Sequence, residues 1–317
     1  MNTGSDRRPA GTRPRRPAVA LALAALAALT ACSASPPRTS PAPRAGTASP
    51  APSGVPASRG PSGVPASRGP SGVPAWLLTR SALAQLRTDL VVRDELNRAR
   101  VYEILQPGQH ALAGVTAEPV VTFASAAALQ NAIRHGQLPT GIYGVLYDPE
   151  AWPFTPVTEQ RDPVRAAASA AVVAHAHGLL LIVAPALNLT AVLDPAGGTP
   201  RWRKFLALNL AGRLARVADV IELQAQSLER DTTAYAAFVR AATAQAAAAH
   251  PRISVLAGLS TNPPGTPVDS QRLAAAIRAT RSAVAGYWLN IPSPGPRCPT
   301  CHPARPDIAI GTLRQLR

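Results

Sequence analysis

The distribution of apolar residues changes at Trp76 and then keeps one rhythm to the end of the 317-residue chain. Short apolar runs, such as 142–148 and 179–185, have the length and composition of buried strands. Between such runs lie stretches rich in Ala and Arg whose apolar residues recur at helical spacing, as in 162–177 and 233–250. The pattern therefore predicts a regular alternation of strands and helices.

The predicted strands share an apolar centre and are followed by polar residues. They cover 101–105, 120–124, 142–148, 179–185, 219–226, 253–259 and 286–291, and the predicted helices cover 77–98, 125–135, 162–177, 201–217, 233–250, 269–284 and 308–316. This alternation predicts an α/β fold with a parallel sheet. A closed barrel and an open doubly wound sheet both satisfy it.

Three features favour the barrel. The length of the ordered part is that of a typical barrel, and no Gly-rich turn typical of nucleotide-binding sheets follows the first strand. The strand at 219–226 also places Glu222, Gln224 and Gln226 on one face, which suits a barrel lumen and its mouth. We therefore expect a (β/α)8-type (TIM-like) barrel over residues 76–317. With seven strands predicted, this barrel is either incomplete or has its eighth strand hidden near residue 112.

Residues 1–31 have the two parts of a secretory signal, an Arg-rich start at 7–16 and an apolar run at 18–29 that is too short to span a membrane. The run closes with L-T-A-C at 29–32, which resembles the lipobox of bacterial lipoproteins. The resemblance implies cleavage before Cys32, lipidation of its thiol, and a lipid anchor that holds the protein on the extracytoplasmic face of the cell membrane. The alternative is an ordinary signal peptide that ends beside a chance cysteine.

Residues 32–75 consist mainly of Pro, Ser, Ala, Gly and Arg. A nonapeptide, S-G-V-P-A-S-R-G-P, occupies 53–61 and recurs at 62–70. One Val per repeat cannot bury enough apolar surface to offset the entropy lost on ordering. The sequence therefore predicts a disordered linker between the anchor and the barrel.

Charge changes this picture little. The formal net charge is +15, but nine Arg and one acid fall within residues 1–75, which leaves +7 for the remainder. Aromatic residues make up only 4% of the chain, and no cluster of Arg with interleaved aromatics is seen, so nucleic acid is not an expected partner. A monomer is the expected state. The wider pattern also resembles uncharacterised actinobacterial lipoproteins, a class that implies no activity.

Polar side chains follow the ends of the predicted strands, and in a barrel these ends converge on one face. The candidate catalytic acids are Asp148, Glu150 and the deeper Glu222. The candidate substrate-binding residues are amides, which bind sugar hydroxyls, and aromatics, which stack on sugar rings: Trp152, Asn188, Gln224, Gln226, Asn262, Trp288 and Asn290. The sequence thus predicts a barrel that acts on a polysaccharide or cell-wall glycan.

The run Y-G-V-L-Y-D-P-E at 143–150 resembles the strand signature D-G-x-D-x-D-x-E of chitinase-type (family 18) glycoside hydrolases. Gly144, Asp148 and Glu150 match it, whereas Tyr143 and Leu146 stand where that family has its first two acids. The resemblance implies that Glu150 is the general acid and that Asp148 steadies the substrate's acetamido group. The missing acids leave a non-catalytic glycan- or protein-binding barrel as the alternative.

Cys298 and Cys301 stand in the run C-P-T-C-H, which matches the attachment pattern of c-type haem. The flanking residues are Pro-rich, and an extracytoplasmic location permits disulfides. We predict a disulfide that stiffens this loop, with a metal site or haem attachment as the alternatives. No metal and no cofactor is expected elsewhere.

Overall fold

The computed structural model describes residues 72–263, 267–295 and 298–317. The predicted signal peptide, the predicted lipidation site Cys32 and the linker up to residue 71 lie outside these residues. Within the described part, no helix combines the length and the apolar character needed to cross a membrane.

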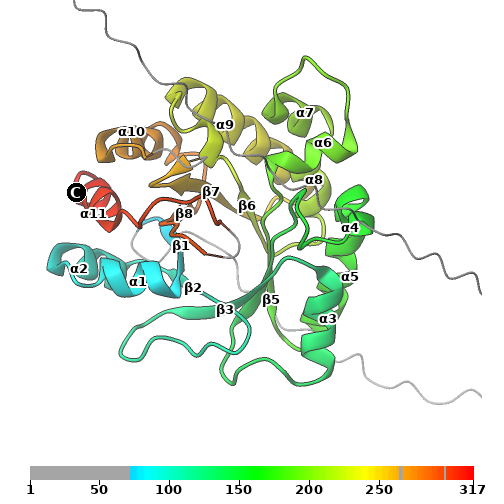
Figure 1. Ribbon diagram of the computed structural model, residues 1–317, viewed down its shortest axis with the longest axis horizontal. Helices are drawn as coiled ribbons and strands as arrows, with labels where there is room; N and C mark the ends of the chain where they lie inside the picture. Colours follow the sequence, from blue (N-terminus) through cyan, green and yellow to red (C-terminus); the bar gives the residue numbers. More distant parts are fainter. Residues whose placement is uncertain (1–71, 264–266, 296–297) are drawn as a thin grey trace, which may run out of the picture. The chain divides into compact units, whose positions relative to one another are not determined.

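Parallel strands close into a barrel, and their order around the ring is their order in the sequence (Figure 1). The eight strands are β1 (Ala75–Thr79), β2 (Val101–Leu105), β3 (Glu118–Phe123), β4 (Gly144–Tyr147), β5 (Leu180–Val183), β6 (Val220–Leu223), β7 (Ser254–Ser260) and β8 (Gly286–Asn290). The ring closes between the first and the last of them, where Trp76 lies opposite Tyr287. The predicted (β/α)8-type barrel is confirmed, and it is complete.

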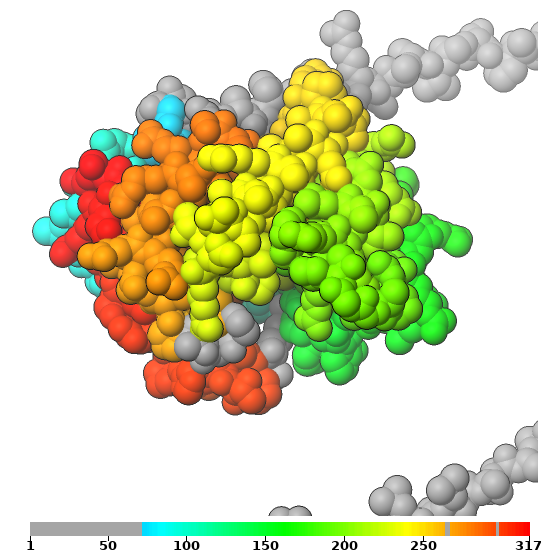
Figure 2. Space-filling view, turned by 90° about the horizontal axis from the view of Figure 1, so that it is seen from above, coloured from blue at the N-terminus to red at the C-terminus, as the bar shows by residue number. Residues whose placement is uncertain are grey.

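Helices surround the strands (Figure 1). They are α1 (Arg80–Leu86), α2 (Leu90–Arg98), α3 (Ala126–Arg134), α4 (Val157–Arg161), α5 (Pro163–Ala176), α6 (Thr190–Leu193), α7 (Arg201–Ala207), α8 (Leu210–Ala215), α9 (Thr232–Ala249), α10 (Ser270–Thr280) and α11 (Pro306–Arg314). The space-filling view shows α9, in yellow, side by side with α10, in orange (Figure 2), and the two are in contact. Consecutive helices thus cover consecutive strands.

The strand that the sequence pattern left out is β1, and the suggestion of a strand near residue 112 was wrong. The run at 76–78 is apolar without interruption and merges with the helical pattern behind it, so the pattern predicted one or two helices from residue 77. The structure separates the two at Thr79, whose backbone is extended and whose hydroxyl accepts a hydrogen bond from the Ala82 N–H. Near residue 112 the chain is instead a loop, tied down where the Leu112 N–H donates to the Glu103 carboxylate at 3.0 and 3.1 Å.

Alternate residues of each strand form two apolar layers. One layer fills the barrel lumen and includes Leu77, Tyr102, Ile104, Val120, Leu146, Ile182, Val220, Leu256 and Trp288. The other faces the helices and includes Trp76, Val145, Tyr147, Val183, Ile221 and Leu223. Because the lumen residues alternate along a strand, the next lumen-facing positions after Leu146 and Val220 are Asp148 and Glu222.

Gly144 begins β4 and is required by the sheet itself. A Cβ at this position would lie 2.5 Å from the backbone oxygen of Leu180, its partner on β5. Real Cβ atoms do not approach backbone so closely, so only Gly fits without moving one strand away from the other. The Gly of the chitinase-type resemblance therefore has a packing reason in this chain.

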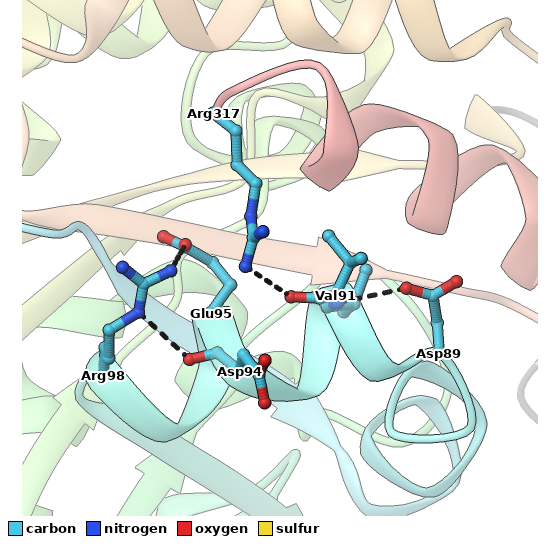
Figure 3. A network of polar contacts seen from close by, with 7 residues as sticks. Asp89, Val91, Asp94, Glu95, Arg98 and Arg317 are labelled. Carbon is cyan, nitrogen blue, oxygen red and sulfur yellow. Dashed lines mark hydrogen bonds and ion pairs between the residues drawn. The ribbon is translucent and has the colours of Figure 1, made fainter.

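The last residues of the chain return to the first helices. Arg317 donates to the Val91 carbonyl oxygen at 3.0 Å, and Arg98 of the same helix donates to the Asp94 carbonyl and the Glu95 carboxylate (Figure 3). Arg314 of α11 also pairs with Asp89, the residue that caps α2. The first and the last elements of the barrel are therefore held together by contacts between helices as well as by the pairing of β1 with β8.

Candidate functional site

A cavity of about 670 Å³ lies at the carboxyl ends of the strands. Its walls come from strand ends and following loops around most of the ring, and include Thr79, Gln106, Thr122, Asp148, Glu150, Trp152, Gln224, Gln226, Ser260, Asn262, Trp288 and Asn290. This is the size of a typical ligand site, and the carboxyl face is where barrel enzymes place theirs.

The structure brings most of the predicted site residues together in this cavity. Asp148, Glu150, Trp152, Gln224, Gln226, Asn262, Trp288 and Asn290 all line it. Glu222 and Asn188 are not among its lining residues, and each takes a different part in the site, as described below. The strand-end residues share one cavity because parallel strands bring their carboxyl ends to one face of the barrel.

Asp148 directly follows β4 and has only 5% of its surface exposed. Its carboxylate accepts a hydrogen bond of 2.6 Å from the Gln224 side-chain amide. The same Gln224 nitrogen donates to the Ala184 carbonyl oxygen at 2.9 Å. The amide that was predicted to bind substrate therefore also orients the acid across two neighbouring strand ends.

Glu150 is held by Asn188, which comes from the loop after β5. The Asn188 Nδ2 donates to the Glu150 carboxylate at 3.2 Å, and its Oδ1 accepts from the Ala151 N–H at 2.8 Å. The Asn188 amide thus fixes both the Glu150 side chain and the backbone of the next residue, Ala151. Asn188 was predicted to bind substrate, and the structure makes it a residue that orients Glu150.

Thr155 is a buried residue of the loop between β4 and α4, and its hydroxyl joins several parts of that loop. Its hydroxyl accepts from the Glu150 N–H at 3.2 Å and from the Trp152 indole N–H at 2.9 Å, and donates to the Ala124 carbonyl at 2.9 Å. The Trp152 ring meets Phe154 edge to face, with centroids 5.0 Å apart. The orientation of the aromatic wall is therefore set by hydrogen bonds within the loop.

Glu222 lies on β6 and is fully buried. Neither carboxyl oxygen has a hydrogen-bond partner among the described residues. Burial raises the pKa of Glu222 well above its usual range, and the negative charges of Asp148 and Glu150 raise it further. Burial and the two neighbouring charges therefore both favour the neutral form of Glu222, which lies beneath two acids that line the cavity.

Gly258 on β7 makes room for this buried acid. A Cβ on Gly258 would lie 2.5 Å from a carboxyl oxygen of Glu222 and 2.7 Å from the side-chain nitrogen of Gln226. Both side chains therefore meet over the bare backbone of β7. Sequence reasoning did not select Gly258, although a Gly inside a predicted strand is a signal of close approach.

The predicted strand at 219–226 is shorter in the structure. β6 ends at Leu223, Gln224 makes a single bridge to Ala186, and Gln226 begins a 3₁₀ turn, η2 (Gln226–Leu228). Gln226 nevertheless lies beside Glu222, as the predicted polar stripe required. The turn carries it there because the chain bends inward over the end of the barrel.

Two further predicted residues present polar atoms without partners. Asn262 is 4% exposed, and neither side-chain Oδ1 nor Nδ2 has a hydrogen-bond partner among the described residues. Trp288 is 9% exposed, and its indole N–H likewise has no hydrogen-bond partner among the described residues. Buried polar groups are normally paired, so these atoms are suited to bind a ligand that enters the cavity.

The sequence reasoning missed the residues that the first strands contribute. The cavity is lined by Thr79 at the end of β1, Ser81 in the first turn of α1, Gln106 directly after β2 and Thr122 on β3. Thr79 and Ser81 were hidden because the strand before them was predicted to be helical. Gln106 could have been found, since it directly follows a predicted strand.

The predicted disulfide is confirmed. Cys298 and Cys301 are bonded, with Cα atoms 5.3 Å apart, and both line the cavity beside the loop that follows β8. Among the described residues, no group of three or more His, Cys, Asp or Glu side chains is arranged to hold a metal ion. The disulfide thus forms part of the wall opposite the β4 loop, because β4 and β8 face each other in an eight-strand ring.

No known family profile matches the chain, and no curated protein is significantly similar to it. Three solved structures illustrate its likeness to known barrels. Triosephosphate isomerase from Bartonella henselae is 14% identical over 68% of this chain and 92% of its own, with a TM-score of 0.39. The PgaB (BpsB) glycoside hydrolase domain from Bordetella bronchiseptica is 11% identical over 68% and 93%, with a TM-score of 0.40. PhdJ bound to a substrate intermediate is 13% identical over 69% and 66%, with a TM-score of 0.37. Likeness at these values concerns the barrel alone, a fold that the closed ring of strands establishes by itself.

Proposed function

We propose that the cavity is the active site of a glycoside hydrolase that acts on a polysaccharide. The observation that carries the proposal is the joint placement of Asp148 and Glu150 in a cavity with amide side chains and the indoles of Trp152 and Trp288. Hydrolysis of a glycosidic bond requires one carboxyl group to protonate the leaving oxygen and a second to stabilise the positive charge that develops on the sugar. Amides and aromatics bind the rest of the substrate.

In this proposal Glu150 is the general acid. It lines the cavity, and the Asn188 side chain donates a hydrogen bond of 3.2 Å to its carboxylate. Asp148, held by Gln224, supplies the negative charge on the same wall. Glu222 is fully buried beneath both acids, so it does not contact a substrate directly, and burial together with their charges favours its neutral form.

The test is release of reducing sugar from a panel of polysaccharides by the full chain. Glu150→Gln keeps the shape of the side chain but removes its acid, so we expect the rate to fall by about 10²- to 10⁴-fold. Glu95→Gln is the matched control, because Glu95 lies on the outer helix α2 and pairs with Arg98 (Figure 3). Equal loss in both variants, or release that survives Glu150→Gln, would contradict the assignment.

A second candidate is a barrel that binds glycan without cleaving it. The observation in its favour is that the first two acids of the chitinase-type signature are absent: Leu146 packs in the lumen core, and the Tyr143 hydroxyl accepts a hydrogen bond of 2.6 Å from Arg100. This candidate predicts tight binding of a glycan by the full chain with no release of sugar. The binding would survive Glu150→Gln.

We further propose that acyl chains on Cys32 anchor the protein at the extracytoplasmic face of the cell membrane. The support is the lipobox-like run at 29–32 after an apolar segment, followed by a long Pro-rich linker. Several acyl chains on one residue give stable attachment, because each buried CH₂ adds about 0.8 kcal/mol. In a bacterial host, Cys32→Ala should move the protein from the membrane fraction to the soluble fraction, and unchanged fractionation would remove the proposal.

A further inference from the structure

Among the described residues that line the cavity, two have charged side chains, and both are acids: Asp148 and Glu150. They stand two residues apart at the end of β4, so their charges act on the same part of the cavity. Their effect is visible on Glu222, whose pKa they help to raise. A cavity with this field attracts a cationic group, and the attraction is strengthened where burial reduces screening by solvent.

Two tryptophans line the cavity on opposite sides of the ring of strands. Trp152 follows β4, and Trp288 lies on β8, on the opposite side of the ring. The face of an indole attracts ammonium groups within about 6 Å of its centre. A site with carboxylates between indoles is therefore suited to bind an ammonium group on a sugar ring.

The buried amide of Asn262 is an independent sign that this cavity is built for a ligand. It lines the cavity, is 4% exposed, and has no hydrogen-bond partner for either polar side-chain atom among the described residues. An amide both donates and accepts, so it matches a hydroxyl group, which does the same. The cavity thus offers countercharge for a cation together with neutral partners for hydroxyls.

We propose that the substrate is a polysaccharide of amino sugars whose amines are free and protonated. This inference rests on the proposed glycoside hydrolase and names its substrate class. Asp148, which follows β4, supplies the countercharge for the ammonium group, the indoles stack on the rings, and Asn262 binds a hydroxyl. An N-acetylated sugar lacks the positive charge and so loses the first of these interactions.

The test is calorimetric binding of three trisaccharides of matched length to the full chain at pH 6: glucosamine trimer, N-acetylglucosamine trimer and glucose trimer. Mass spectrometry of the ligand after each titration confirms that it is intact. We expect the glucosamine trimer to bind at least about tenfold more tightly than the other two, in line with a charge-assisted contact. This advantage should shrink when NaCl is raised from 50 to 500 mM, because salt screens the charges.

Two variants separate charge from general affinity. Asp148→Asn should weaken binding of the glucosamine trimer far more than binding of the glucose trimer, and Asn262→Ala should weaken all three ligands alike. Thermal melting shows whether each variant is folded, and the salt dependence of the natural chain stands even if one is not. Equal binding of the three trimers, no binding of any, or a preference that survives both high salt and Asp148→Asn overturns the inference.

The outcome is distinguishable from that of the proposed function. Cleavage of neutral or acetylated glycans with no preference for free amines would leave the hydrolase standing and remove only the substrate class. A clear preference for the glucosamine trimer with no cleavage of any glycan would remove the hydrolase and leave only the preference for free amines standing.

Discussion

Glu222 shows how far a single side chain can be changed by its surroundings. An ordinary Glu is charged at neutral pH, but this one is buried, lacks hydrogen-bond partners among the described residues, and lies near two negative charges. All three conditions favour the neutral acid. A carboxylate in this position destabilises the folded chain, which is typical of acids that serve a site rather than the core.

Glu222→Gln should therefore change how stability depends on pH. The folded-state pKa of Glu222 is raised above the ordinary value of 4.5, so the natural chain loses stability as pH rises from about that value towards the folded pKa. The slope from one such group is at most about 1.4 kcal/mol per pH unit. Gln cannot ionise, so the variant should melt at a similar temperature to the natural chain at pH 4 and above it at pH 8. Parallel melting curves across this range would show that Glu222 does not titrate in this way.

Gly258→Ala tests the space that this acid occupies. The added methyl would collide with the Glu222 carboxyl and the Gln226 amide, so we expect a loss of about 1–3 kcal/mol in the free energy of unfolding, measured in urea. Gly197→Ala is the matched control, because a Cβ there meets nothing within 4 Å. Similar, small effects in both variants would mean that the two side chains move aside freely.

At the scale of elements, the loop between β4 and α4 decides where the acids point. Sequence predicted the strand before it and the polar residues within it, because both are local features. It could not predict that Asn188, from the loop after β5, would hold Glu150, or that Thr155 would bind Ala124 on a neighbouring strand end. Those contacts depend on which loops the closed ring brings together.

Thr155→Val should disturb this loop with little change in shape. The substitution removes the hydroxyl that joins Glu150, Trp152 and Ala124, so activity on a polysaccharide should fall several-fold or more, and stability by about 1–3 kcal/mol. Thr243→Val is the control, because the Thr243 hydroxyl has no hydrogen-bond partner within the described part of the chain and its loss should be neutral or stabilising. Assays of reducing sugar and thermal melting report the two effects separately, and full activity in Thr155→Val would show that the loop keeps its form without this hydroxyl.

At the scale of the whole molecule, barrel closure depends on the five-residue strand β1, whose last three residues the sequence pattern assigned to a helix. β1 pairs with β2 on one side and with β8 on the other, so it is the element that joins the ring. Without it, β2 and β8 would each present an unpaired edge. The strand was missed because a short apolar run directly before a helix has no periodicity of its own.

Truncation tests this role. A chain that begins at Gly72 keeps β1 and should unfold in one cooperative transition on heating, followed by circular dichroism. A chain that begins at Arg80 lacks the closing strand and should show no cooperative transition, because the exposed edges and lumen leave too little buried surface. Equal melting of the two chains would mean that β1 is dispensable for the fold.

The sequence alone determined the alternation of strands and helices, the barrel class, the disulfide, and a group of strand-end residues that line the cavity. Each of these follows from local pattern: the period of apolar residues, the polar residues at strand ends, or the spacing of two cysteines. Only the tertiary structure decided that β1 closes the ring, that Asn188 orients Glu150, that Gly258 leaves space for Glu222, and that burial raises the pKa of Glu222. These properties arise from pairs of residues far apart in the chain, whose distance and burial exist only once the strands have closed around a common lumen.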